Sequence, residues 1–294
     1  MTLQSLVRAL ADRCTSLLVS TYFDVSYRLL ASAGGRELLR AAAAAGAPAV
    51  HGYTTSRDVD ALLDAIQPSP SDVLMDLGCG MGDVAIEIHR RTGCRVVGVD
   101  GAPAAVAEAR RRARAAGADP AVRFVVADLS SPPVRASAAY ALDSLMFVPR
   151  PPEVICSLSR SIEPPGRVFV TFLDHRRLGR DAFARFIEAG GVRVERLEDV
   201  SAEFRQRNRQ RVVAARRLLR DRPSGTGRLV GWLVLAEEAF VARLVRRGRL
   251  RRWRFTVAAD ASARGATPTV HGHFVSTLTE VLRLRTYGSS DDAR

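Results

Sequence analysis

Short apolar runs alternate with Ala-, Arg- and Glu-rich stretches through the middle of the chain, beginning near Asp72. The runs predict strands at Val73–Leu77, Arg95–Val99, Arg123–Ala127, Ala138–Leu142 and Arg167–Phe172. The stretches between them predict helices at Asp83–Arg91, Ala104–Ala116 and Pro151–Ile162. Strands that alternate with helices about every 25 residues predict an α/β fold with a doubly wound, mostly parallel sheet.

The regions on either side of this core have a different pattern. Residues 1–66 are predicted to be helical, with breaks at Gly34-Gly35 and Gly46–Pro48 and a last helix capped by Thr55 or Ser56. Beyond residue 175 the pattern predicts a helix at Asp181–Ala189, a strand at Val192–Leu197, long helices at Ser201–Arg220 and Leu229–Arg247, and a strand at Leu250–Val257.

These patterns divide the chain into five parts. They are an N-terminal helical segment (1–66), an α/β core (67–200), a helical insertion (201–248), a last strand of the core (249–258) and a tail (259–294) with one short helix expected at Val275–Arg283.

A glycine-rich turn after the first strand carries the strongest chemical signal. Asp76 is followed by Gly78, Cys79, Gly80 and Gly82, and then by a helix. Glycines allow a tight turn and close approach of a ligand, and the N-terminus of the helix suits a carboxylate. Dinucleotide folds also use such a turn, which leaves a nicotinamide or flavin enzyme open. The Gly-x-Gly-x-Gly spacing, with an acid two residues before it, argues against that alternative.

The segment Asp76–Gly82 resembles motif I of the class I S-adenosylmethionine (SAM)-dependent methyltransferases. Other motifs of that family have counterparts in order: Val97–Asp100, Val126–Leu129 and Ile162–Arg167, where Arg167 replaces the second glycine of the turn before strand five. The resemblance covers residues 50–258. It implies a seven-stranded Rossmann-like sheet with a reversed last strand, Leu250–Val257, paired beside Val192–Leu197. The helices between 201 and 247 would then cap a substrate pocket.

The resemblance also implies SAM as the cofactor and assigns residues to it. Asp100 would accept hydrogen bonds from both ribose hydroxyls, with Gly101 beside it. Asp128 would accept from the adenine amino group, and the backbone N–H of Leu129 would meet the ring. The glycine-rich turn would complete the cofactor site with Asp76, Gly78, Cys79, Gly80 and Gly82.

Methyl transfer mainly requires alignment of donor and acceptor and exclusion of water, with a base only where the nucleophile carries a proton. Asp143, followed by Ser144, is a candidate to orient the substrate, bind the SAM amino group or act as a base; capping a helix is its structural alternative. Histidine has a pKa suited to a base, so His175 is a further candidate; its structural alternative is a solvated loop residue. Tyr53 lies where family members cover SAM with an N-terminal segment, and His51 is a weaker candidate there.

The net charge of +13 suggests an anionic partner, but all 44 basic residues are Arg, as a GC-rich genome would encode. Arg205, Arg209, Arg216 and Arg220 fall near one face of a predicted helix, and Arg207 and Arg211 near another. A solvated helix is the simpler interpretation. The alternative is a cap that recognises a diphosphate, phosphate or carboxylate acceptor.

Other features argue against further classes of partner. The four cysteines are widely spaced, and His271 and His273 lack a third ligand, so no metal site is predicted. No apolar run approaches the roughly 20 residues of a membrane span, and the N-terminus lacks the order of a signal peptide, so we expect a cytoplasmic protein. A homodimer is compatible with these patterns.

Together these observations predict a SAM-dependent methyltransferase that acts on a small molecule, in bacterial specialised metabolism. One alternative is a prenyl-diphosphate C-methyltransferase that uses the Arg-rich helices. Another is an RNA-methylating or RNA-binding protein that uses the basic C-terminal half, although aromatic residues make up only 6% of the chain and offer few stacking platforms. A third is an accessory protein without catalysis, against which the intact cofactor motifs argue.

Overall fold

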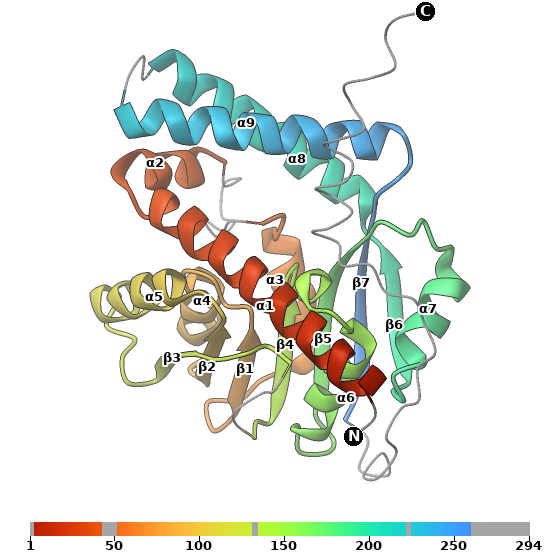
Figure 1. The fold of residues 1–294 in the computed structure, drawn as a ribbon. Helices are drawn as coiled ribbons and strands as arrows, with labels where there is room; N and C mark the ends of the chain where they lie inside the picture. The colour runs from red at the N-terminus through yellow and green to blue at the C-terminus, as the bar shows by residue number, and fades with distance from the viewer. Residues whose placement is uncertain (1–2, 43–51, 131–134, 222–224, 260–294) are drawn as a thin grey trace, which may run out of the picture.

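The computed structural model describes residues 3–42, 52–130, 135–221 and 225–259. Its sheet has the order β3-β2-β1-β4-β5-β7-β6 (Figure 1). The strands are β1 (Val73–Leu77), β2 (Arg95–Asp100), β3 (Val122–Val126), β4 (Ala138–Leu142), β5 (Arg167–Asp174), β6 (Val194–Asp199) and β7 (Arg251–Ala258). β7 runs antiparallel to both β5 and β6, between which it lies, and the other pairs are parallel. The seven-stranded, mostly parallel sheet with a reversed last strand is therefore confirmed.

Helices cover both faces of the sheet. They are α1 (Leu3–Leu30), α2 (Ala33–Ala42), α3 (Ser56–Ile66), α4 (Asp83–Thr92), α5 (Pro103–Ala115), α6 (Pro151–Arg160), α7 (Arg180–Glu188), α8 (Ser201–Asp221) and α9 (Gly225–Arg246), with a short 3-10 turn at Leu145–Phe147. Side chains alternate along each strand. Leu74 and Tyr140 pack with α3, α4 and α5, whereas Met75 and Ala139 pack with α6 and α7.

The N-terminal helices differ from the prediction in one detail. The break lies at Ala31-Ser32, and Gly34-Gly35 belong to the first turn of α2. A Cβ atom on Gly35 would lie 2.4 Å from the Cα of Leu30, so glycine permits the close approach of the two helices at this corner. Thr55 is the N-cap of α3, in a reciprocal capping box with Asp58, as the sequence predicted.

Two helical layers stand over the carboxyl ends of the parallel strands. α8 and α9 lie side by side at the top of Figure 1 with α2 against them, and α1 runs below them toward the viewer's side of the sheet. α1 is tied to the start of α5, because Asp24 Oδ1 accepts from the backbone N–H of Ala104 at 2.6 Å. None of the described helices is long and apolar enough to cross a membrane. His51, His271, His273 and the predicted helix Val275–Arg283 lie outside the described residues.

Candidate cofactor and acceptor site

The glycine-rich turn is pinned to the neighbouring strand β2. The backbone N–H groups of Gly78 and Cys79 both donate to the carbonyl oxygen of Val99, at 2.7 and 3.0 Å. Gly78 has a φ of +83°, and a Cβ atom there would lie 2.2 Å from Cβ of Ser144. Glycine is therefore required at this position both by the left-handed backbone and by the close passage of the turn beneath the end of β4.

Asp100, the last residue of β2, faces the same turn. Its Oδ2 accepts from the backbone N–H of Gly80 at 2.8 Å, and its Oδ1 accepts from that of Ala102 at 2.9 Å. Burial raises the pKa of this carboxyl, while the two N–H donors act in the opposite direction. The carboxylate is thus held rigidly at the end of its strand without a cationic partner among its hydrogen-bond donors.

Asp76 lies on β1 beneath the turn and is buried. Burial raises its pKa to about 8, and the negative charge of Asp100 adds to this effect. At neutral pH Asp76 therefore retains its proton. A cation that entered the space above would favour its ionisation.

Helix α1 forms the opposite wall above the turn. The hydroxyl of Ser20 donates to the carbonyl oxygen of Gly101, next to Asp100. A Cβ atom on Gly80 would lie 2.8 Å from the hydroxyl oxygen of Tyr27. Between these two residues of α1, Phe23 packs edge-to-face on Phe147, with ring centroids 4.8 Å apart. The composition of this segment predicts a helix but does not indicate which of its residues reach the turn.

These walls enclose a cavity of about 830 Å³. Its volume is in the upper part of the roughly 300–1,000 Å³ typical of small-molecule sites. One end is the glycine-rich turn; the other is apolar, with Val148, Leu173, Phe240, Val241 and Leu244 among its lining residues. The predicted site residues that line it are Asp76, Gly78, Cys79, Gly80, Asp100, Gly101, Asp128, Leu129, Asp143, His175 and Tyr53.

Gly82 is the predicted site residue that does not line the cavity. A Cβ atom on Gly82 would lie 2.6 Å from the ring of Phe124 on β3, so this glycine serves the packing of α4 against the sheet. The structure thus gathers the other predicted residues around one space, and their individual roles stay predictions.

Comparison with known proteins agrees with this architecture. Residues 74–166, from β1 to the turn before β5, match the family model of a methyltransferase domain. The segment from Leu74 to Gly166 is therefore a methyltransferase domain of the class I SAM-dependent type. SAM is the cofactor of this superfamily.

The relatives differ in what they act on. The chain is 34% identical to the 23S rRNA (uracil(1939)-C(5))-methyltransferase RlmD of Azoarcus sp. over 134 residues, which are 44% of this chain and 30% of that protein. It is 35% identical to a geranyl diphosphate 2-C-methyltransferase of Streptomyces lasalocidi over 130 residues, 42% of this chain and 43% of that protein. It therefore spans less than half of the length of either relative.

Among solved structures, the [4+2]-cyclase SpnF has a similar fold. The TM-score is 0.64 at 22% identity, over 82% of this chain and 94% of that one. At this identity the likeness concerns the fold and not the reaction.

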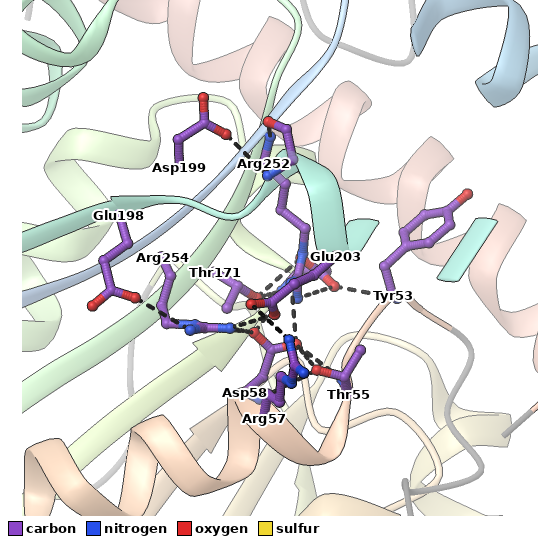
Figure 2. Close-up of polar contacts among 12 residues, drawn as sticks. Tyr53, Thr55, Arg57, Asp58, Thr171, Glu198, Asp199, Glu203, Arg252 and Arg254 are labelled. Atoms are coloured by element: carbon purple, nitrogen blue, oxygen red, sulfur yellow. Dashed lines mark hydrogen bonds and ion pairs between the residues drawn. The ribbon is translucent and has the colours of Figure 1, made fainter. Parts of the chain in front are cut away.

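A buried cluster of charged residues lies beside β7 (Figure 2), and one of its members, Asp143, lines the cavity. The side chains of β7 alternate, so that Trp253 packs with Phe183 on one face while Arg252 and Arg254 point to the other. Arg252 donates through Nη1 to both oxygens of Asp58 at 3.1 Å. Arg254 donates through Nη2 to Oδ1 of Asp58 at 2.8 Å. Burial acts against the charge of Asp58, but the two guanidinium groups outweigh it and lower the pKa of the carboxyl.

Asp143 is the second carboxylate held by Arg252. Nε and Nη2 of Arg252 donate to its two oxygens, at 2.9 and 3.0 Å. The backbone N–H of Tyr53 and the hydroxyl of Thr171 also donate to it, at 3.2 and 3.0 Å. With these four contacts Asp143 is held in place as the hydrogen-bonded partner of an arginine. Of its three predicted roles, this geometry suits orientation better than proton abstraction.

Tyr53 presents its ring to the cavity but its hydroxyl to the helices above. The hydroxyl donates to Oε2 of Glu238 on α9 at 2.9 Å. Asn208 of α8 donates to the same oxygen at 2.5 Å, and Arg211 of α8 donates to the other oxygen. Burial and the charge of Glu238 raise the pKa of Tyr53, so its hydroxyl keeps its proton and fixes the ring as part of the wall.

The arginines of α8 divide into the two faces that the sequence predicted. The first set, Arg205, Arg209, Arg216 and Arg220, is exposed, whereas Arg207 and Arg211 are buried. Neither set lines the cavity. The buried face serves contacts within the cap, as the Arg211–Glu238 ion pair shows.

His175 lines the cavity at the end of β5. The turn that carries it is fixed by the buried Asp174, whose oxygens accept from the backbone N–H groups of Arg176 and Leu178, each at 2.9 Å. Among the described residues, no group of three or more His, Cys, Asp and Glu side chains could hold a metal ion.

Sequence reasoning missed Asp58, Glu238 and Arg252. Asp58 was detectable as the third residue of a capping box after Thr55, but nothing marked its second role as the partner of Arg252 and Arg254.

Proposed function

We propose that this protein transfers the methyl group of SAM to a small molecule bound at the apolar end of the cavity. One observation carries the proposal: among the described residues, one cavity is lined both by the glycine-rich turn with its carboxyl groups and by a set of apolar side chains, which form its apolar chamber. In this proposal Asp100 binds the ribose, Asp128 and Leu129 bind the adenine, and the turn from Gly78 to Gly80 binds the methionine part.

The reaction requires little chemical catalysis from the protein itself. Methyl transfer is an in-line displacement in which the acceptor's lone pair forms a bond to the methyl carbon as the carbon–sulfur bond breaks, leaving S-adenosylhomocysteine (SAH). Helices α1 and α9 both line the cavity, and in this proposal they limit the access of water and hold donor and acceptor in line. His175 takes up the proton where the acceptor carries one, and Asp143 orients the wall through Tyr53.

RNA is less well suited to this site. The chamber is lined by α1 and α9, which favours a small acceptor. Specialised metabolism and a cytoplasmic location stay predictions.

The test uses SAM labelled in its methyl group, incubated with the full chain and a panel of apolar alcohols, amines and carbon nucleophiles. Label in an extracted small product, with an equal amount of SAH, is the expected result. Label in added rRNA instead would contradict the proposal. Product formed without SAH would contradict it as well.

A further inference from the structure

Helix α1 carries an exposed apolar stripe that begins at the cavity. Leu18, Tyr22 and Val25 share one face of the helix, because they are spaced by four and three residues. They are 63%, 45% and 53% exposed, and Leu17 beside them is 69% exposed. Leu17, Leu18 and Tyr22 also line the cavity, whereas Val25 does not. The stripe therefore borders the cavity and continues outward from it, where a ligand inside the cavity would not cover it.

The carboxyl end of α9 borders the same cavity with a basic surface. Four exposed arginines, here called the basic turn, lie at this end of the helix: Arg243, Arg246, Arg247 and Arg249. Leu244 and Leu250, which alternate with them along the chain, line the cavity. The sequence has no Asp or Glu between positions 239 and 259, so neighbouring residues do not offset this charge. Figure 1 shows this end of α9 above the amino-terminal half of α1.

The apolar stripe and the basic turn together fit one kind of partner. Contiguous exposed apolar side chains mark contact sites for proteins or membranes. An acidic protein surface would account for the arginines but not for the stripe. A membrane with anionic lipids accounts for both, because apolar side chains of a surface helix enter the boundary of the acyl chains while arginines attract the headgroups. The apolar chamber between the two elements agrees with this, since an apolar acceptor concentrates in lipid.

We infer that the stripe on α1 and the basic turn on α9 dock the protein on a membrane that contains anionic lipid, and that an apolar acceptor passes from the lipid into the cavity. Docking of this kind is peripheral and differs from a membrane span, which none of the described helices could form. The passage of the acceptor rests on the proposed function, whereas docking is measured without methyl transfer.

The first test is cosedimentation of the full chain with vesicles of phosphatidylcholine and phosphatidylglycerol in equal amounts, and with vesicles of phosphatidylcholine alone. The protein should bind the mixed vesicles more tightly, and added salt should weaken this binding. The double variant Arg246→Glu, Arg247→Glu should bind them at least about tenfold more weakly. Both substituted residues lie outside the cavity lining, so SAH affinity should stay as in the wild type.

A matched control makes the same change of charge on the other side of the sheet. Arg95 and Arg114 are exposed, and they lie at the amino end of β2 and near the end of α5, whereas the cavity lies at the carboxyl ends of the strands. The double variant Arg95→Glu, Arg114→Glu should therefore lose much less affinity for the mixed vesicles.

The second test removes the apolar contact. Leu17→Ser combined with Leu18→Ser should weaken binding to the mixed vesicles severalfold, because less apolar surface enters the lipid. Leu229→Ser combined with Leu233→Ser is the control. These leucines are 51% and 49% exposed, lie near the amino end of α9 and do not line the cavity, so this variant should bind as the wild type does.

No binding to the mixed vesicles, or equal losses in the arginine variant and its control, would overturn the inference. Binding that needs the arginines but not Leu17 and Leu18 would overturn it in favour of an acidic protein partner. Self-association that the leucine variant abolishes, without vesicle binding, would assign the surface to a second copy of the chain. A protein that binds vesicles but transfers no methyl group counts against the proposed function alone. Methyl transfer to a dispersed acceptor without vesicle binding counts against docking alone.

Discussion

The glycine-rich turn and the cluster around Arg252 each hold two carboxyl groups near the carboxyl ends of the strands, but they do so with different partners. In the turn, Asp100 is held by backbone N–H groups and Asp76 is kept protonated by burial. In the cluster, Asp58 and Asp143 are held by arginine. This difference distinguishes a binding site from a structural support. The carboxyl groups at the turn can still attract a cation, whereas those of the cluster are already paired with arginine.

The largest effect should come from breaking the cluster. Arg252→Gln leaves Asp143 buried without its cationic partner, and loss of one member of a buried ion pair costs about 3–5 kcal/mol. Urea unfolding should show this loss in the free energy of unfolding. The neighbour Arg251 is a matched control, because its side chain is 44% exposed and lies 3.9 Å from Asp199. Arg251→Gln should change stability by less than about 0.5 kcal/mol. Equal losses of unfolding free energy in the two variants would show that the cluster does not stabilise the fold.

A smaller effect should come from the turn. Gly78→Ala places a Cβ atom 2.2 Å from Ser144 at a φ of +83°, so the turn or the end of β4 must move. Gly117→Ala is the control, because its φ of +68° is also left-handed but nothing lies within 4 Å. The control should cost about 1 kcal/mol of stability and leave SAH affinity intact. Gly78→Ala should cost more and lower the affinity at least about tenfold. Similar affinities in calorimetric titration would show that the turn does not hold the cofactor.

The smallest effect should be a dependence of stability on pH. The pKa of Asp76 is about 8 in the folded protein, against roughly 3.9 for a solvated aspartate. Between these values the folded protein binds a proton that the unfolded chain lacks, so this group lowers stability as pH rises from about 4 to 8. Asp76→Asn removes this dependence, so its free energy of unfolding relative to the wild type should rise with pH between about 5 and 8. If the free energies of unfolding of the two proteins change in parallel with pH, the raised pKa of Asp76 is refuted.

Much of the sheet and the glycine turn could be predicted because their signals are local. The turn lies within a few residues of its strand, and Asp100 ends the next strand along the chain. The cluster could not be predicted in this way. Arg252 meets Asp143 across 109 residues and Asp58 across 194. The alternation from Arg252 to Phe255 predicts a strand with one polar face, and only the packing of α3 and α8 shows that this face is covered.

The central claim is that the glycine turn and Asp100 bind the SAM-type cofactor. The most direct test is calorimetric titration of SAH into the wild type, Asp100→Asn and the exposed control Asp119→Asn. The wild type and the control should bind alike, and Asp100→Asn should bind at least about tenfold more weakly, because hydrogen bonds from the ribose hydroxyls would lose their charged acceptor. Equal affinity in Asp100→Asn, or no binding of SAH by the wild type, would contradict the account.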